Sequence, residues 1–380
     1  MRANTTGERA EAWRTVGVVE RRVLFVHGYD PRGPAPYHAL MAAEARPGLF
    51  EVGPRQGAAW TVAVDWPEGR AESRVEVLRW DDLVRAHWVR GPGAAGLPWR
   101  FLAAYVRAGV VARAMRDNRP LFAAMLLPAL VAASHGALMI AVTTLAVLAI
   151  AALATRLGGS AAWGLTGLAA LLAWSPLRRA IQGRLDLDWL SQCFDALARF
   201  RDMPPDREAK LDALAARIAE VARDAPDQEV LVVGHSIGTL MAAAAVSRAL
   251  ALSPGLERRA RLVTLGHCLS VYTLLGGDAG WRRDLARLTA SDLPWTDVTS
   301  PADGASAGRW GPLRFSAHEA AGEDRVRARS PRFHEALDPA RMSRLRRDPR
   351  ALHFQYLGLS DRPEVYDVRR LIAPPPEAAR

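Results

Sequence analysis

Ser236 is the central residue of the stretch GHSIG, residues 234–238, which matches the pattern G-x-S-x-G. In that pattern a strand turns sharply into a helix, and the serine occupies the strained corner with its hydroxyl placed for nucleophilic attack. A serine hydroxyl is a weak nucleophile unless a base takes its proton and N–H donors stabilise the oxyanion that forms. A catalytic Ser236 therefore requires a base, an acid that orients the base, and oxyanion donors elsewhere in the chain.

The residues on either side of this stretch have the composition that a strand-to-helix turn needs. Glu229–Val233 is a short apolar run rich in valine, which predicts a buried parallel strand, and Thr239–Leu250 is rich in alanine, which predicts a helix. In a chain with 30 glycines the pattern alone could mark a purely structural glycine turn. The flanking strand and helix favour the catalytic interpretation.

An upstream segment supplies candidates for the oxyanion donors. The apolar run Arg22–His27 predicts a strand that ends in His27-Gly28 and opens into a loop rich in glycine and proline. Together with GHSIG, this strand and His-Gly loop resemble the α/β-hydrolase superfamily, in which such a loop gives one oxyanion N–H and the residue after the nucleophile gives the other. The resemblance implies Tyr29, or its neighbour Gly28, and Ile237 as the donors. It leaves His27 a structural role beneath the loop.

The superfamily order is serine, then acid, then histidine, each in a loop after a later strand. The segment Pro294–Thr299 predicts a strand, and the turn that follows it carries Asp303 before Gly304. We therefore expect Asp303 to be the triad acid. Asp297, which lies within the predicted strand, is the alternative.

The base should follow the acid, which excludes His267. A charged segment precedes His353, and aromatic and apolar residues that could begin a closing helix follow it. This context resembles the late histidine loop of the superfamily, so the resemblance implies His353 as the base. His318 and His334 lie in polar stretches and are the alternatives. In the expected triad, His353 takes the Ser236 proton and returns it to the leaving group, while Asp303 fixes the imidazole tautomer.

The remaining periodic segments place this site in an α/β domain. Further strands are expected from Ser73 and from Arg261 and over Trp60–Trp66, and further helices are expected over Leu185–Arg201 and Asp206–Ala225. This alternation predicts a doubly wound, mainly parallel sheet, and the resemblance stated above implies that it is α/β-hydrolase-like. The domain would be split into residues 20–115 and 180–370, with a polar N-terminal segment at 1–19 and a flexible tail at 371–380.

A long apolar stretch separates the two parts of this domain. Leu121–Thr155 has no formal charge and would make roughly 50 Å of helix, more than the ~30 Å of bilayer hydrocarbon, and Leu157–Trp174 could make a second crossing. We therefore expect a transmembrane hairpin inserted at 120–176. An even number of crossings keeps the two parts of the domain on one side. The flanking arginines place that side in the cytoplasm, since only Arg156 lies between the runs.

The formal net charge of +10 comes almost entirely from arginine, and arginines cluster on both sides of the apolar stretch. This placement favours membrane lipids as partners rather than nucleic acid, for which no recognisable module is present. The sequence contains no phosphate loop, metal-ligand cluster or nucleotide fingerprint, so we expect no cofactor and no metal. Cys193 and Cys268 are the two cysteines and form no disulfide framework. The oligomeric state stays open.

These observations predict a membrane-anchored serine hydrolase that cleaves ester or thioester bonds of small-molecule or lipid-derived acyl substrates. The inference of lipid substrates depends on the membrane hairpin, because a fold does not fix a substrate. The alternative is a non-catalytic, membrane-anchored scaffold or lipid-binding protein that has a hydrolase fold. That alternative predicts a Ser236 that does not react with an acylating or phosphonylating probe.

Overall fold

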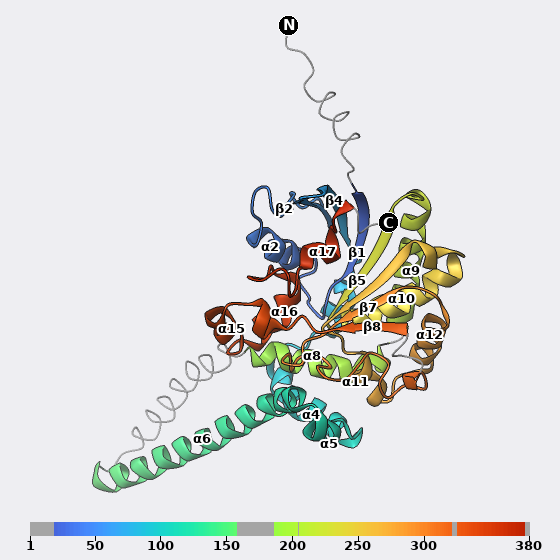
Figure 1. Cartoon of the computed structure of the whole chain (residues 1–380). Helices are drawn as coiled ribbons and strands as arrows, with labels where there is room; N and C mark the ends of the chain where they lie inside the picture. The colour runs from blue at the N-terminus through green and yellow to red at the C-terminus, as the bar shows by residue number, and fades with distance from the viewer. Residues whose placement is uncertain (1–18, 158–185, 204, 321–324, 377–380) are drawn as a thin grey trace.

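The computed structural model describes residues 19–157, 186–203, 205–320 and 325–376 (Figure 1). Their centre is one eight-stranded sheet with the strand order β2-β3-β4-β1-β5-β6-β7-β8. Neighbouring strands from β4 to β8 run parallel, whereas β3 is antiparallel to both β2 and β4. The strands are β1 (Val19–Val26), β2 (Glu51–Val52), β3 (Ala59–Trp66), β4 (Gly69–Val77), β5 (Glu229–His235), β6 (Ala260–Leu265), β7 (Trp295–Val298) and β8 (Val326–Arg329).

The central strands are buried on both faces because their sequences are nearly continuous apolar runs. Along β1, Leu24 and Val26 face one hydrophobic core, and the alternate residues Val23 and Phe25 face the other. This alternation follows from the two-residue period of side chains in a strand. Helices on both faces of the sheet bury these two sets of side chains.

The first core lies beneath α3, α4, α8, α9, α10 and α12, and the second beneath α2 and the C-terminal helices α14 to α17. The helices are α2 (Ala35–Ala43), α3 (Asp81–His87), α4 (Leu97–Arg107), α5 (Val110–Asp117), α6 (Arg119–Leu157), α8 (Leu187–Arg199), α9 (Asp206–Asp224), α10 (Gly238–Leu252), α11 (Leu269–Leu274), α12 (Ala279–Ala290), α14 (Phe333–Ala336), α15 (Pro339–Leu345), α16 (Pro349–Phe354) and α17 (Val368–Ile372). Short 3₁₀ turns lie at Gly91–Gly96, Phe200–Asp202, Leu256–Arg258 and Gln355–Leu357.

The prediction of an α/β fold with a mainly parallel sheet covered on both faces is confirmed. The strand expected from Ser73 is present but begins earlier, at Gly69. The edge strand β8 was not expected from the sequence, because VRAR alternates arginine with small residues and three of its four residues are exposed. The division of the chain into residues 20–115 and 180–370 stays a prediction.

The prediction of a two-span integral membrane protein, with a transmembrane hairpin at 120–176, is wrong. Within the described ranges, no helix combines the length and the apolar character that crossing a bilayer requires. The apolar run begins in α6, where Leu121, Met125 and Ala129 are buried, and the helix packs there against α4, α5 and α8. The second expected span, Leu157–Trp174, lies outside the described residues from 158 onward.

The start of α6 also supports the loop that follows β7. A Cβ atom added at Gly304 would lie 2.5 Å from the carbonyl oxygen of Pro120 and 2.9 Å from Cβ of Ala124. The Asn118 side-chain amide, just before α6, donates a hydrogen bond to the Ala307 carbonyl oxygen at 2.5 Å. The loop after β7 therefore lies in direct contact with the first turns of α6.

If the first turns of α6 belong to the core of the domain, removing a buried side chain there destabilises the whole fold. Met125 is 0% exposed, whereas Met115 on α5 is 56% exposed. We expect Met125→Ala to lower the free energy of unfolding by about 2–5 kcal/mol, and Met115→Ala to change it by less than about 0.5 kcal/mol. Urea denaturation followed by circular dichroism measures both values. Equal effects of the two substitutions would exclude this packing.

Candidate active site

Ser236 lies at a sharp corner between β5 and α10. Its φ is +59°, in the left-handed region that a residue with a Cβ adopts at a cost of about 1–3 kcal/mol. The corner is held on both sides: the Ser236 N–H donates to the Leu265 carbonyl at 2.9 Å, and the Thr239 N–H and hydroxyl donate to the Ser236 carbonyl at 3.0 and 2.6 Å. The local geometry is therefore the strained strand-to-helix turn that the sequence predicts.

Both glycines around Ser236 are required by close packing. A Cβ at Gly234 would lie 2.8 Å from the Ala242 Cβ and from the Thr239 Cα. A Cβ at Gly238 would lie 2.2 Å from the His27 carbonyl oxygen. Contacts this short do not occur between real atoms, so only glycine lets α10 begin directly against the end of β1.

The order of the strands brings the loops that carry Gly28, Ser236 and Asp303 to one edge of the sheet. The chain passes from β1 to β4 on one side and then returns to β5 on the other side of β1. Ligand sites of open parallel sheets lie at such a reversal, outside the carboxyl ends of the strands. At this edge a Cβ on Gly28 would lie 3.1 Å from the Ser236 Cβ, and a Cβ on Gly266, which follows β6, would lie 3.3 Å from Asp303 Oδ2.

His353 and Asp303 form a buried pair at this edge. Nδ1 of His353 lies 2.8 Å from Oδ2 of Asp303, and the two side chains are 0% and 1% exposed. The same Oδ2 accepts a hydrogen bond from the Tyr356 hydroxyl at 3.0 Å, and Oδ1 accepts one from the Ala305 N–H at 3.0 Å. Burial alone would raise the pKa of Asp303, but His353 and these hydrogen bonds hold that pKa below its ordinary value.

The ionised Asp303 determines the tautomer of His353. A carboxylate can only accept hydrogen bonds, so the proton of neutral His353 lies on Nδ1 and the lone pair lies on Nε2. Nε2 is buried and has no hydrogen-bond partner among the described residues. The arrangement therefore presents an oriented imidazole with a free basic nitrogen.

The base is linked to the nucleophile turn through His235, the residue before Ser236. Nε2 of His235 lies 3.0 Å from the His353 carbonyl oxygen, and the two imidazole rings are 4.8 Å apart. Burial and then the proximity of His353 lower the pKa of His235 to about 3, so this ring is neutral near pH 7 and its Nε2–H donates. Within the described residues no hydrogen bond joins the Ser236 hydroxyl to His353. Such bonds often tighten only when substrate binds.

The structure separates the alternatives for the acid and the base. Asp297 lies within β7, where it accepts hydrogen bonds from Thr264 at 2.7 Å and Thr299 at 3.3 Å, and its Oδ2 is 3.8 Å from Nε2 of His267. His334 is 62% exposed beside Glu335. Within the described residues neither His318 nor His334 contacts either aspartate. The structure thus brings Asp303 together with His353 and with none of the alternatives.

The three predicted oxyanion donors differ in availability. The Gly28 N–H donates to the Tyr37 hydroxyl at 3.0 Å, so it is already engaged. By contrast, the backbone N–H groups of Tyr29 and Ile237 donate no hydrogen bond to any described residue, so both are available. His27 lies beneath this loop, with Nδ1 2.8 Å from the Gly28 carbonyl oxygen and its own carbonyl bound by Trp80. This position agrees with the structural role expected for His27.

Sequence reasoning missed two residues of this site. Tyr356 binds Asp303, and its position three residues after His353 was the available signal, because residues three apart lie on one face of a helical turn. His235 was visible as the variable residue before Ser236, but its bond to the His353 carbonyl depends on tertiary structure. No group of three metal-ligating side chains occurs in the part of the chain that the structure describes.

Comparisons with protein-family models, with curated proteins and with solved structures found no match to this chain. The residues and their geometry are therefore the basis for any assignment of function.

The close approach of α10 to β1 predicts that Gly238 tolerates no side chain. Because an added Cβ would overlap the His27 carbonyl oxygen, we expect Gly238→Ala to lower the free energy of unfolding by at least about 1–3 kcal/mol. Gly96 precedes α4 and has nothing within 4 Å of an added Cβ, so Gly96→Ala is the matched control and should be neutral or slightly stabilising. Chemical denaturation measures both. A neutral Gly238→Ala would contradict the packing described here.

The ionised Asp303 also predicts a pH dependence of stability. Its folded-state pKa is lower than the ordinary value of 3.8, so its charge stabilises the fold at higher pH, and this contribution disappears as the pH falls through the folded-state pKa. Over this acid range, we expect the unfolding free energy of the wild type to fall more steeply than that of Asp303→Asn. The exposed Asp227 provides the control, since Asp227→Asn should keep the wild-type slope. Urea titrations at several pH values test this, and equal slopes for Asp303→Asn and wild type would contradict it.

Proposed function

We propose that this protein is a serine hydrolase that cleaves ester or thioester bonds through Ser236, His353 and Asp303. The observation that carries the proposal is the placement of a strained serine turn at the same sheet edge as a buried imidazole–carboxylate pair. The free Nε2 of His353 adds support, because a general base needs an unshared electron pair on the nitrogen that takes the proton. The resemblance to α/β-hydrolases is part of the same proposal.

Each group has a role in the proposed reaction. Nε2 of His353 accepts the proton of Ser236 as Oγ attacks the carbonyl carbon, and the N–H groups of Tyr29 and Ile237 stabilise the resulting oxyanion. His353 then protonates the leaving group, which departs and leaves an acyl-enzyme. A water molecule, activated by the same imidazole, releases the acid and regenerates Ser236. Throughout, Asp303 holds the imidazole orientation and stabilises its charged form.

The bond type follows from the serine chemistry, whereas lipid-derived acyl groups lose their support. That preference depended on a membrane hairpin, and no described helix is suited to cross a membrane. The proposal is therefore limited to esters and thioesters, without a lipid requirement.

A second candidate function is a non-catalytic binding protein built on the same fold. It is favoured by one observation: Ser236 is 4% exposed and His353 is 0% exposed, so neither side chain is openly accessible. A hydrolase with this geometry must open to admit substrate. A binding protein needs no such movement at Ser236.

Labelling with a fluorescent fluorophosphonate distinguishes the two functions, because the probe reacts with an activated serine. We expect wild type to be labelled, Ser236→Ala not at all, and His353→Ala and Asp303→Asn at rates lower by about 10²–10⁴-fold. His334→Ala is the control and should be labelled at the wild-type rate, since His334 is 62% exposed and outside the proposed triad. Absence of labelling in folded wild type would reject the hydrolase and leave the binding protein.

A further inference from the structure

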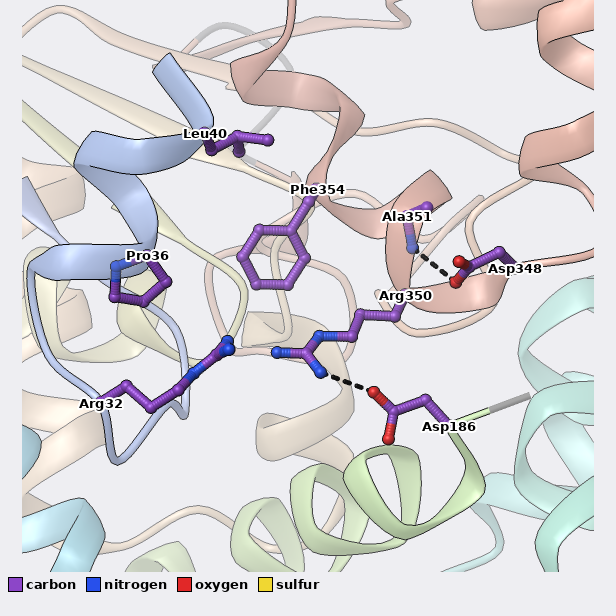
Figure 2. Close-up of a pocket in the computed structure, with 8 residues that line it drawn as sticks. All are labelled: Arg32, Pro36, Leu40, Asp186, Asp348, Arg350, Ala351 and Phe354. Atoms are coloured by element: carbon purple, nitrogen blue, oxygen red, sulfur yellow. Dashed lines mark hydrogen bonds and ion pairs between the residues drawn. The ribbon is translucent and has the colours of Figure 1, made fainter. Parts of the chain in front are cut away.

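A pocket of about 350 Å³ opens near the proposed triad, between α2, α16 and the loop after β1 (Figure 2). One part of its wall is apolar and is formed by Pro36 and Leu40 of α2 and by the ring of Phe354. Figure 2 shows this ring between the two elements, facing the open space. The pocket can therefore hold a short aliphatic group against Phe354.

Two guanidinium groups enter the same space. The side chains of Arg32 and Arg350 come from opposite sides of the pocket, and their charged ends point toward one another below Phe354 (Figure 2). Each guanidinium is paired with an aspartate, and an anion between the two would bind through the N–H donors that these pairs leave unused. The arrangement is thus suited to an anionic ligand group.

Both arginines are held in place and still have unused donors. Arg32 binds Asp30 through Nε and Nη2, at 2.6–3.2 Å, and Arg350 binds Asp186 through Nη1 at 2.6 Å. The Arg350 guanidinium also lies 5.8 Å above the ring of Trp189. Three guanidinium nitrogens make no hydrogen bond within the described residues: Nη1 of Arg32, and Nε and Nη2 of Arg350. A guanidinium has five N–H donors in a rigid plane, so each arginine can bind a ligand without releasing its aspartate.

The pocket wall is continuous with the proposed active site. Phe354 follows His353 in the chain, and its ring lies 5.1 Å from the ring of His235. Trp189, beneath Arg350, lies 5.6 Å from the ring of His353. The pocket therefore lies next to aromatic rings that contact the two imidazoles of the proposed site.

We propose that this pocket binds a substrate carboxylate carried on a short aliphatic chain, with the carboxylate between Arg32 and Arg350 and the chain against Phe354. The substrate assignment rests on the proposed hydrolase function, whereas carboxylate binding itself does not. The preferred substrates are then esters or thioesters that carry a second, free carboxylate.

A singly charged carboxylate fits the pocket better than a phosphate monoester. Asp30, Asp186 and the pocket-lining Asp348 surround the two arginines and reduce their positive field. The negative charges of these aspartates repel an anionic ligand, and they repel a dianion about twice as strongly as a monoanion. A monocarboxylate also matches the planar edge of a guanidinium in a bidentate contact. A neutral head group would accept weaker hydrogen bonds from the two guanidinium groups than a carboxylate does.

Equilibrium binding of three six-carbon probes to the wild-type protein tests the assignment: hexanoate, hexanamide and hexyl phosphate, each measured by isothermal titration calorimetry near pH 8. We expect hexanoate to bind at least about tenfold tighter than hexanamide, and tighter than hexyl phosphate, because charge-assisted hydrogen bonds to arginine are stronger than neutral ones. Hexanamide binding as tightly as hexanoate, or no binding by any probe, would overturn the proposal. Tighter binding of hexyl phosphate would replace the carboxylate by a phosphate.

Variants connect the binding to the two arginines. We expect Arg350→Gln and Arg32→Gln each to weaken hexanoate binding by about tenfold, and Arg350→Lys to weaken it as well because the planar fork is lost. Arg344→Gln, an exposed change on α15 outside the pocket, should bind as wild type does. Equal affinities in the pocket variants and the control would overturn the assignment. The comparison of probes on wild type remains decisive if a variant does not fold.

The fluorophosphonate experiment separates this inference from the proposed function. Selective hexanoate binding by a protein that the probe does not label would reject the hydrolase and retain a carboxylate site. Normal labelling of Ser236 with no preference for hexanoate would reject the pocket assignment alone. Where both hold, hexanoate should also slow the labelling of Ser236 in wild type and not in Arg350→Gln.

Discussion

The close approach between the start of α10 and the end of β1 is the constraint on which the geometry of the site depends. Gly238 lies so near the carbonyl oxygens of Val26 and His27 that no side chain fits there. This contact fixes where α10 begins, and the turn from β5 must then be completed within the few residues around Ser236. The positive φ of Ser236 is the cost of so short a turn. The strand order then brings the loops carrying Gly28 and Asp303 to the same edge.

A charge buried at this edge is stable only because its partners are arranged around it. Asp303 has a hydrogen bond from His353, one from Tyr356 and one from the Ala305 backbone, which together satisfy both carboxylate oxygens. Nε2 of His353 is a buried nitrogen with no partner in the described part of the chain, as is Nδ1 of the neighbouring His235. The free lone pair of His353 follows from the ionised state of Asp303, so the acid sets the chemistry available at the base without contacting Ser236.

The parts of the site that could be predicted from sequence are those that depend on local conformation. The turn around Ser236 has a local cause, since glycine spacing and the flanking runs specify it. Asp303 was favoured over Asp297 because it follows a strand, and the structure pairs it with His353. The bond from His235 to the His353 carbonyl is a tertiary contact with no local signature. The spacing of Tyr356 from His353 indicates a shared helical face but does not identify Asp303 as its partner.

The apolar run was misinterpreted because composition does not identify what covers an apolar residue. The burial of Met125 within the domain and exposure to lipid require the same kind of side chain. The pocket could not be predicted from the sequence either. Arg32 and Arg350 are separated by more than three hundred residues, and only the folded chain brings them together.

The contact between α6 and the loop after β7 limits where a segment of this protein could be removed or exchanged with that of another protein. Gly304, next to Asp303, is seated on the Pro120 carbonyl, and Asn118 holds the Ala307 carbonyl. The segment between β4 and β5 looks in the chain like an insertion that could be excised or exchanged. Within that segment, however, the first turns of α6 support the loop that carries Asp303. The natural boundary of an exchangeable module therefore lies beyond those turns, farther along α6, and not at the end of β4.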